Sequence, residues 1–176
     1  MQAPEPTKSY GKTFAIIAWL IVMVMLFLFF DDTLDKQLNP NQQLQSVQGS
    51  RGETRTVLIR NKAGHYVGTA LVNSQPVDFM LDTGATTVAI AQATAETLGL
   101  PFGRAMQVST ANGITTAYAS RLDTLQLGDI VLHNIPASIV PGMDKSGAGT
   151  EILLGMSALK QLEFHQQGNQ LTLIQH

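Results

Sequence analysis

The sequence predicts a mostly β domain that closes on itself as a barrel, carries two short helices and follows one transmembrane helix. Short apolar runs of β type alternate with turn residues from residue 57 onward. A continuous apolar run, Phe14–Phe30, precedes them and carries no charge. Many short strands with few helices are typical of a sheet that closes, or nearly closes, on itself.

Length and composition limit the classes of protein to consider. The 176 residues give room for one ordinary domain with accessory segments. The net charge of -2 comes without any cluster of Lys and Arg, so we expect no nucleic-acid partner. The chain has no cysteine, which excludes disulfides and thiolate catalysis. Its 4 histidines are widely spaced and lack the pattern of a helical zinc site, so we expect no metal and no other cofactor.

The N-terminal apolar run has the length of a bilayer span. As a helix, residues 14–30 would extend about 25 Å, at about 1.5 Å per residue. Lys8 and Lys12 precede the run and Asp31 follows it. The positive-inside rule therefore predicts that residues 1–13 form a cytoplasmic tail and that the later residues lie on the other side of the membrane.

A cleaved signal peptide is the alternative interpretation of this segment. The run is longer than an ordinary signal-peptide core, and it ends in Phe-Phe-Asp-Asp rather than at a small-x-small cleavage site. We therefore expect a single-pass membrane protein with its folded domain on the non-cytoplasmic side. That side is the periplasm if the host is a Gram-negative bacterium.

Residues 31–56 are polar and rich in Gln, without apolar periodicity. This composition predicts a flexible linker of about 25 residues with a reach of about 27 Å, which would let two neighbouring domains meet. The folded domain is then expected over residues 57–176.

The elements of this domain follow from its short apolar runs and their turn residues. Gly99 and Pro101 mark the end of a helix predicted over 91–98, and a second helix is predicted over 156–161, after Gly155. The predicted strands span 57–60, 65–72, 77–81, 106–110, 114–122, 125–132, 136–140, 151–154 and 170–174.

The third strand leads directly into a recognisable motif. The segment Phe79–Thr87 contains Asp82-Thr83-Gly84-Ala85 after an apolar strand, and it resembles the active-site loop of retropepsin-like aspartic proteases. A second family element, Ile152-Leu153-Leu154-Gly155, stands before a short helix. Between them, Ala111-Asn112-Gly113 occupies the tip of a predicted hairpin. The resemblance covers most of residues 57–176 and implies a single-lobed acid-protease fold.

The resemblance also implies roles for these residues. Asp82, Thr83 and Gly84 would form the catalytic loop, and the hairpin tip Ala111-Asn112-Gly113 would be the flap that closes over an extended peptide. The residues expected to support the loop structurally are Ala85, Leu153, Leu154 and Gly155. Asp78, earlier on the same strand, is expected to be a solvated charge outside the site.

The chain supplies a single Asp-Thr-Gly. Asp123-Thr124 is followed by Leu125 and lies within a strand pattern, so we interpret it as structural. Metal-free amide hydrolysis by this family uses two carboxylates that share one proton. The second carboxylate must then come from another chain, which predicts a homodimer that hydrolyses peptide bonds in polypeptide substrates.

The sequence departs from the viral members of the family in two places. Thr86-Thr87 stands where viral enzymes commonly have an acidic residue, and the helix predicted over 91–98 has no viral counterpart. The sequence resembles the cellular and bacterial members of the family more than the viral ones. The alternative function is a non-catalytic, membrane-anchored module of the same fold that dimerises or binds peptides.

Overall fold

The computed structural model describes residues 7–110, 113–143 and 150–176. The chain divides into two compact units, residues 1–36 and residues 37–176. Unit 1 consists of most of helix α1 (Thr7–Leu38). The side chains of Phe14–Phe30 are exposed except at Ala18. By length and composition, α1 is apolar enough to cross a membrane or to act as a signal sequence.

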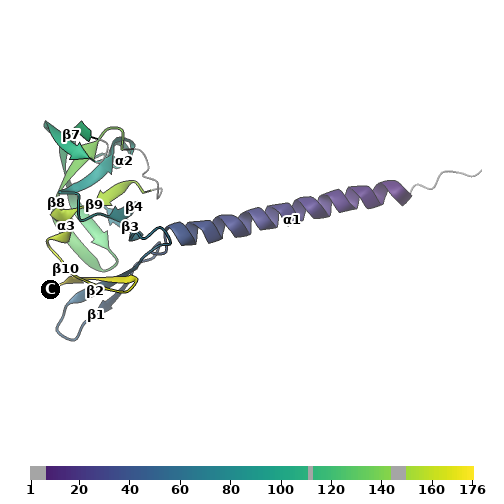
Figure 1. The fold of residues 1–176 in the computed structure, drawn as a ribbon, viewed down its shortest axis with the longest axis horizontal. Coiled ribbons are helices and arrows are strands. Elements are labelled where there is room, and N and C mark those ends of the chain that lie inside the picture. The colour runs from purple at the N-terminus through teal and green to yellow at the C-terminus, as the bar shows by residue number, and fades with distance from the viewer. Residues whose placement is uncertain (1–6, 111–112, 144–149) are drawn as a thin grey trace, which may run out of the picture. The chain divides into compact units, whose positions relative to one another are not determined.

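Unit 2 is built mainly of β-strands, as Figure 1 shows. A seven-stranded sheet has the order β3-β4-β9-β5-β8-β7-β6, and β3 also pairs with β7. This extra pairing closes six of the strands into a barrel and leaves β6 outside. The strands in this order are β3 (Val67–Val72), β4 (Gln75–Leu81), β9 (Ile152–Leu154), β5 (Val88–Ala91), β8 (Ile130–Val140), β7 (Gly113–Leu127) and β6 (Ala105–Thr110).

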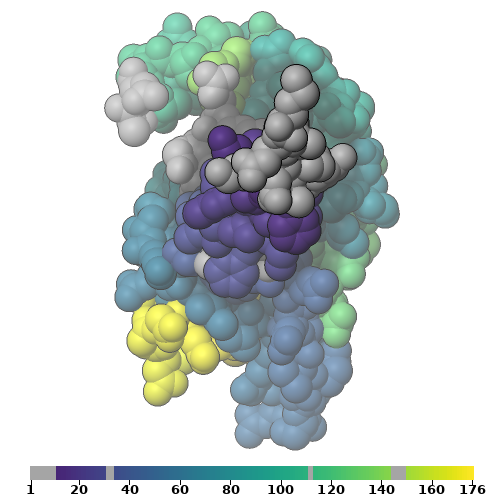
Figure 2. Space-filling model, turned by 90° about the vertical axis from the view of Figure 1, so that its right-hand side faces the viewer, coloured from purple at the N-terminus to yellow at the C-terminus, as the bar shows by residue number. Residues whose placement is uncertain are grey.

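A second, four-stranded antiparallel sheet has the order β1-β2-β11-β10. Figure 2 shows its C-terminal strands in yellow at one end of unit 2, with the region of β6 and β7 in teal and green at the opposite end. Its members are β1 (Gln45–Gln48), β2 (Thr54–Ile59), β11 (Gln170–Gln175) and β10 (Glu163–Gln167).

Apolar residues that alternate along these strands form one core. Phe79 on β4 and Leu122 on β7 are fully buried, and Leu58 and Leu173 carry the core into the four-stranded sheet. Two short helices, α2 (Gln92–Thr97) and α3 (Met156–Leu159), complete unit 2. The predicted mostly β barrel with two short helices is confirmed.

The strand predicted over 125–132 is divided by a turn, and its two parts belong to longer strands. Residues 125–127 continue the run at 114–122 as β7, and residues 130–132 continue into the run at 136–140 as β8. Asp123 and Asn134 resemble turn residues, but the register continues past them, from Leu122 opposite Ile135 to Thr124 opposite His133. The turn lies instead at Gly128, which has a φ of 65° and starts a two-residue hairpin loop.

Three strands of the structure, β1, β5 and β10, were not predicted from the sequence pattern. β5 is only 4 residues long and leads straight into α2. All residues of β10 are exposed, so no apolar alternation marks it. The residues of β1 are also mostly exposed, so β1 has no apolar alternation either.

The predicted linker over residues 31–56 differs from the structure. Helix α1 continues to Leu38, β1 pairs with β2, and the folded unit begins at Gln37 instead of residue 57. The polar residues responsible are not solvated: Asn39, Asn41 and Glu53 are buried. Buried amides and carboxylates that make hydrogen bonds produce no apolar periodicity, so composition alone suggested a flexible chain.

Candidate active site

The Asp-Thr-Gly loop starts at the end of strand β4, which neighbouring segments hold from both sides. β4 lies between β3 and β9. The N–H of Leu81 donates to the carbonyl of Tyr66 at 2.9 Å, and the N–H of Asp82 donates to the carbonyl of Leu154 at 3.1 Å. These two hydrogen bonds fix the position at which the chain leaves the sheet.

The loop then turns back on the Asp82 side chain. The N–H of Gly84 donates to Asp82 Oδ1 at 2.8 Å, and the N–H of Ala85 donates to the Asp82 carbonyl at 3.3 Å. Asp82 is half-buried, whereas Thr83 and Gly84 are exposed. A Cβ at Gly84 would stand 3.1 Å from Asp82 Oδ1, so a side chain there would crowd the carboxylate.

Gly155 permits a close crossing of two chain segments behind the loop. A Cβ at Gly155 would collide with the backbone carbonyls of Thr87 and Ala85. The next residue, Met156, donates its N–H to the Ala85 carbonyl at 2.8 Å. The structure therefore brings Ala85 and Gly155, two of the residues assigned to support, into direct contact beneath Asp82.

A buried serine, which the sequence pattern did not reveal, ties the same region together. Ser157 Oγ accepts a hydrogen bond from the N–H of Val88 at 2.9 Å and donates to the carbonyl of Pro136 at 2.7 Å. Thr87 Oγ1 lies 2.9 Å from Ser138 Oγ. The end of the loop is thus joined to both α3 and β8. Serine after Gly155-Met156 gives no recognisable signal, because its partners are backbone groups distant in sequence.

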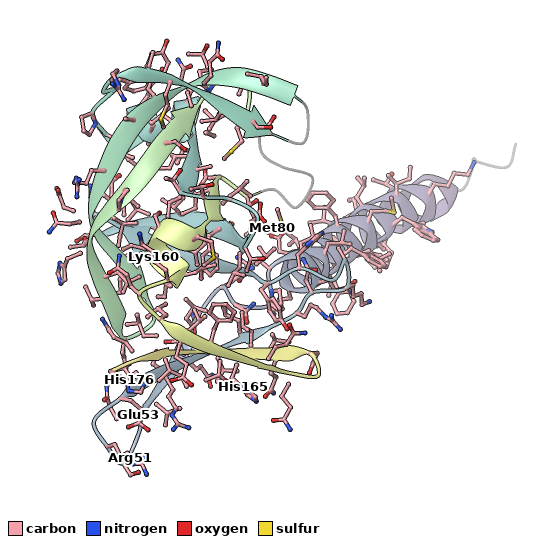
Figure 3. All side chains as sticks on the ribbon, turned by 60° about the vertical axis from the view of Figure 1, so that its left-hand side comes forward. Arg51, Glu53, Met80, Lys160, His165 and His176 are labelled. Atoms are coloured by element: carbon pink, nitrogen blue, oxygen red, sulfur yellow. The ribbon has the colours of Figure 1, made fainter. Side chains whose placement is uncertain are left out.

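Leu153 and Leu154 differ in their surroundings. Leu154 is fully buried in the core, whereas Leu153 is half-buried. Across the sheet, Leu153 stands in register with Met80 on β4 and Ala89 on β5, which are also half-buried. Met80, labelled in Figure 3, lies two residues before Asp82. The three side chains form an apolar row on the face opposite the core.

The hairpin assigned to the flap is formed by β6 and β7. Thr110 pairs with Gly113 at the end where the two strands are connected, and Thr110 Oγ1 donates to the Gly113 carbonyl at 2.8 Å. Gly113 has a φ of 108°, and the following Ile114 is 75% exposed. Ala111 and Asn112, the other two residues of the predicted tip, lie outside the described residues.

The other acidic residues of the barrel are placed differently from Asp82. Asp123 is exposed on β7. Asp78 was expected to be a solvated charge, but it is half-buried, and its Oδ1 accepts hydrogen bonds from Thr69 Oγ1 at 2.6 Å and from Asn39 Nδ2 at 3.2 Å. Among the described residues, no group of three His, Asp or Glu side chains could hold a metal ion.

Comparison with known proteins agrees with this geometry. The family model described as gag-polyprotein putative aspartyl protease matches residues 68–161, more than half of the chain. A Sinorhizobium protein described as an uncharacterized protein in the cobV 5' region is 32% identical over 123 residues, which cover 68% of this chain and 51% of that protein. The chain thus spans about half the length of this curated relative.

Solved structures also match this chain, and the first one described here shares its fold. A retropepsin-like aspartic protease from Rickettsia conorii matches with a TM-score of 0.59 and 27% identity, over 76% of this chain and 96% of that one. The retroviral protease-like domain of Ddi1 from Leishmania major matches with a TM-score of 0.43 and 17% identity, over 62% of this chain and 90% of that one. On the family match, the chain belongs to the retropepsin-like aspartic protease family.

Proposed function

We propose that this protein is an aspartic endopeptidase that hydrolyses peptide bonds in extended polypeptide segments, with a dyad formed by Asp82 of two chains. Family and fold indicate aspartic protease activity. The observation that carries the proposal is the loop itself: a half-buried Asp82 carboxylate beside an exposed Thr83 and Gly84, on a backbone fixed from both sides.

The chemistry follows from bringing two such carboxylates together. Two carboxyl groups about 3 Å apart cannot both ionise, so one remains a carboxylate while the other keeps its proton. The carboxylate takes a proton from the attacking water. The protonated partner donates a hydrogen bond to the carbonyl oxygen of the scissile amide, which becomes the oxyanion of the tetrahedral intermediate. No metal is needed for either step.

A second chain is required because one chain offers half of this arrangement. Within the described residues, Asp82 is the one acidic side chain in the loop, and Asp78 and Asp123 are placed elsewhere. Strand β10 supplies an edge suited to pairing between chains. Among the described strands it pairs with β11 alone, and all of its residues, Glu163–Gln167, are exposed. We propose that its free edge contributes to a two-fold interface.

Thr83 is assigned to the contact between the two loops. Its side chain is exposed in the single chain, and its hydroxyl can both donate and accept a hydrogen bond. A hydrogen bond from Thr83 to the partner loop would hold the two carboxylates at a fixed separation. Thr83→Ala should therefore weaken the dimer in sedimentation experiments. Equal dimer affinity for this variant and the parent protein would remove the assignment.

Helix α1 is proposed to anchor the protein in a membrane with its N-terminus in the cytoplasm. Its apolar length supports the span. The lysines before Phe14 and the aspartates after Phe30, which flank the apolar run within the helix, support the orientation. Anchoring would confine two chains to one surface and raise their effective concentration, which favours a dimer with a weak interface.

The test is cleavage of an unbiased peptide library by the full-length protein in detergent, beside Asp82→Asn, between about pH 4 and pH 7. We expect activity that depends on Asp82 and rises faster than linearly with protein concentration until the dimer is saturated. Asp82→Asn is isosteric and should keep the fold. Cleavage that survives in this variant would contradict the proposal, and absence of cleavage by a demonstrated dimer would favour the non-catalytic peptide-binding module.

A further inference from the structure

The last residue of helix α1 and the residues that follow it make hydrogen bonds throughout unit 2. Leu38–Asn41, here called the strap, belongs to unit 2 and makes hydrogen bonds to four other parts of it. The carbonyl of Leu38 accepts a hydrogen bond from Asn61 Nδ2 at 2.9 Å. Asn39 and Asn41 are 7% and 4% exposed, so both amide side chains are effectively removed from water.

Asn41 takes the place of a strand between β2 and β3. Its Nδ2 donates to the carbonyls of Ile59 at 2.9 Å and Val67 at 2.6 Å, and its Oδ1 accepts from the N–H of Ile59 at 2.7 Å. Its backbone carbonyl accepts from the N–H of Thr69 at 3.2 Å. Every one of these groups would lose a partner if the strap detached, and unpaired buried polar groups are costly.

Asn39 connects the strap to the strand that carries Asp82. Its Nδ2 donates to Thr69 Oγ1 and to Asp78 Oδ1, at 3.2 Å each, and Thr69 Oγ1 itself donates to Asp78 Oδ1 at 2.6 Å. Asp78 lies four residues before Asp82 on β4, and its backbone carbonyl accepts from the N–H of Glu151 at 2.9 Å, at the start of β9. The network therefore holds both strands whose ends fix the Asp82 backbone.

We propose that the strap is a positioning element of the active site: Asn39, acting through Asp78, sets the position of β4 and hence of the Asp82 carboxylate. This inference rests on the proposed function. Catalysis by paired carboxylates depends on their separation, and a shift of about 1 Å can cost about a hundredfold in rate. The polar segment after the helix is then part of the catalytic unit and not a spacer.

A reciprocal exchange of side chains tests the connection. Asn39→Asp places two carboxylates against each other, whereas the double variant Asn39→Asp with Asp78→Asn restores one amide and one carboxylate with their places exchanged. We expect Asn39→Asp to lower kcat about tenfold with KM changed by less than about twofold, and the double variant to recover to within about threefold of the parent. Asp78→Asn alone, which pairs two amides, should lose less.

The assays use the full-length protein at concentrations that saturate the dimer and at temperatures where circular dichroism shows each variant folded. Gln48→Glu is the matched control. Gln48 Nε2 donates to Thr54 Oγ1 at 3.1 Å in an exposed pair on β1 and β2, so the same amide-to-carboxylate change occurs without a route to β4. A parental kcat in Asn39→Asp, or a loss of kcat that the double variant does not restore, would overturn the inference.

Amide hydrogen exchange provides a readout that needs no activity. If the strap positions β4, exchange at the N–H groups of Leu81 and Asp82 accelerates in Asn39→Asp, returns to the parental rate in the double variant and is unchanged in Gln48→Glu. Faster exchange confined to the N–H groups of Ile59 and Thr69, the direct partners of the strap, would contradict the proposal that the strap positions β4. A parent protein that cleaves no peptide would remove the proposed function, and this exchange experiment would still decide the role of the strap.

Discussion

Glu53 and Asp82 are carboxylates in turns next to β-strands, and their surroundings are opposite. The Glu53 side chain is 7% exposed, accepts hydrogen bonds from the N–H of Arg51 at 3.0 Å and pairs with Arg55 at 2.8 Å. Asp82 is half-buried and receives the N–H of Gly84 at 2.8 Å. Figure 3 shows Glu53 and Met80, near Asp82, at separate places in unit 2.

This difference separates a structural carboxylate from one available for chemistry. The hydrogen bonds of Glu53 are directed at its own turn, and its charge has a cation beside it. Asp82 keeps hydrogen-bonding capacity on an exposed face of its loop. Its own backbone N–H is bonded to the Leu154 carbonyl, and the Ala85 carbonyl is bonded to the N–H of Met156. A rigid backbone under an incompletely partnered carboxylate is what a catalytic group requires.

The largest effect is expected when the glycines beside the two carboxylates, Gly155 and Gly49, are each replaced by alanine and the losses in protein stability are compared. A Cβ at Gly155 would meet backbone carbonyls of Thr87 and Ala85, whereas a Cβ at Gly49 would meet the carboxyl group at the end of the Glu53 side chain, which can turn aside without moving the backbone. Gly155→Ala should therefore destabilise the protein by about 3 kcal/mol or more, and Gly49→Ala by about 1 kcal/mol. Chemical denaturation measures both. Equal losses would mean that the crossing at Gly155 is not rigid.

A smaller effect is expected from the Ser157 hydroxyl, which holds the end of the Asp-Thr-Gly loop. Ser157→Ala leaves the buried N–H of Val88 without its acceptor and should cost about 1–3 kcal/mol. Ser120 is the matched control, because its Oγ also donates to a proline carbonyl, that of Pro101 at 2.9 Å, in an exposed position. Ser120→Ala should cost less than about 0.5 kcal/mol. A loss for Ser120→Ala as large as that for Ser157→Ala would contradict the assignment.

The smallest effect concerns pH. The pKa of Glu53 lies below its ordinary value, first because its carboxylate accepts a hydrogen bond from its own backbone N–H and then because of Arg55 and the N–H of Arg51. A lowered folded-state pKa gives stability that is present above the unfolded-state pKa and is lost as pH falls through the folded-state value. Glu53→Gln should thus lower the melting temperature at neutral pH, with a difference that shrinks in acid. A pH-independent difference would contradict this origin.

The barrel and the Asp-Thr-Gly loop that follows β4 could be predicted from sequence because their signals are local. β4 alternates in burial and runs into Asp82-Thr83-Gly84, and Gly155 follows an apolar strand, so each element carries its own pattern. The difference in burial between Leu153 and Leu154 could not be predicted, because burial on β9 depends on which face of the sheet each side chain occupies. The register of β9 is set by pairing with β4 and β5, residues far away in the chain.

The segment before residue 57 could not be predicted for a different reason. Asn39 and Asn41 are buried by partners on β2, β3 and β4, and nothing in the polar sequence around them indicates those partners. Polar residues that replace a strand through side-chain hydrogen bonds have the same composition as a solvated linker. The same limitation applies to Ser157, whose two partners are backbone groups.

Mixing chains tests the central claim, a dyad built from Asp82 of two chains, most directly. Parent protein and Asp82→Asn are combined in equal amounts at fixed total concentration, allowed to exchange partners and assayed for peptide cleavage. If both carboxylates are needed, only dimers of two parent chains are active, and about one quarter of the parental activity remains. About one half of the activity would mean that each chain acts with its own carboxylate, which would contradict the account.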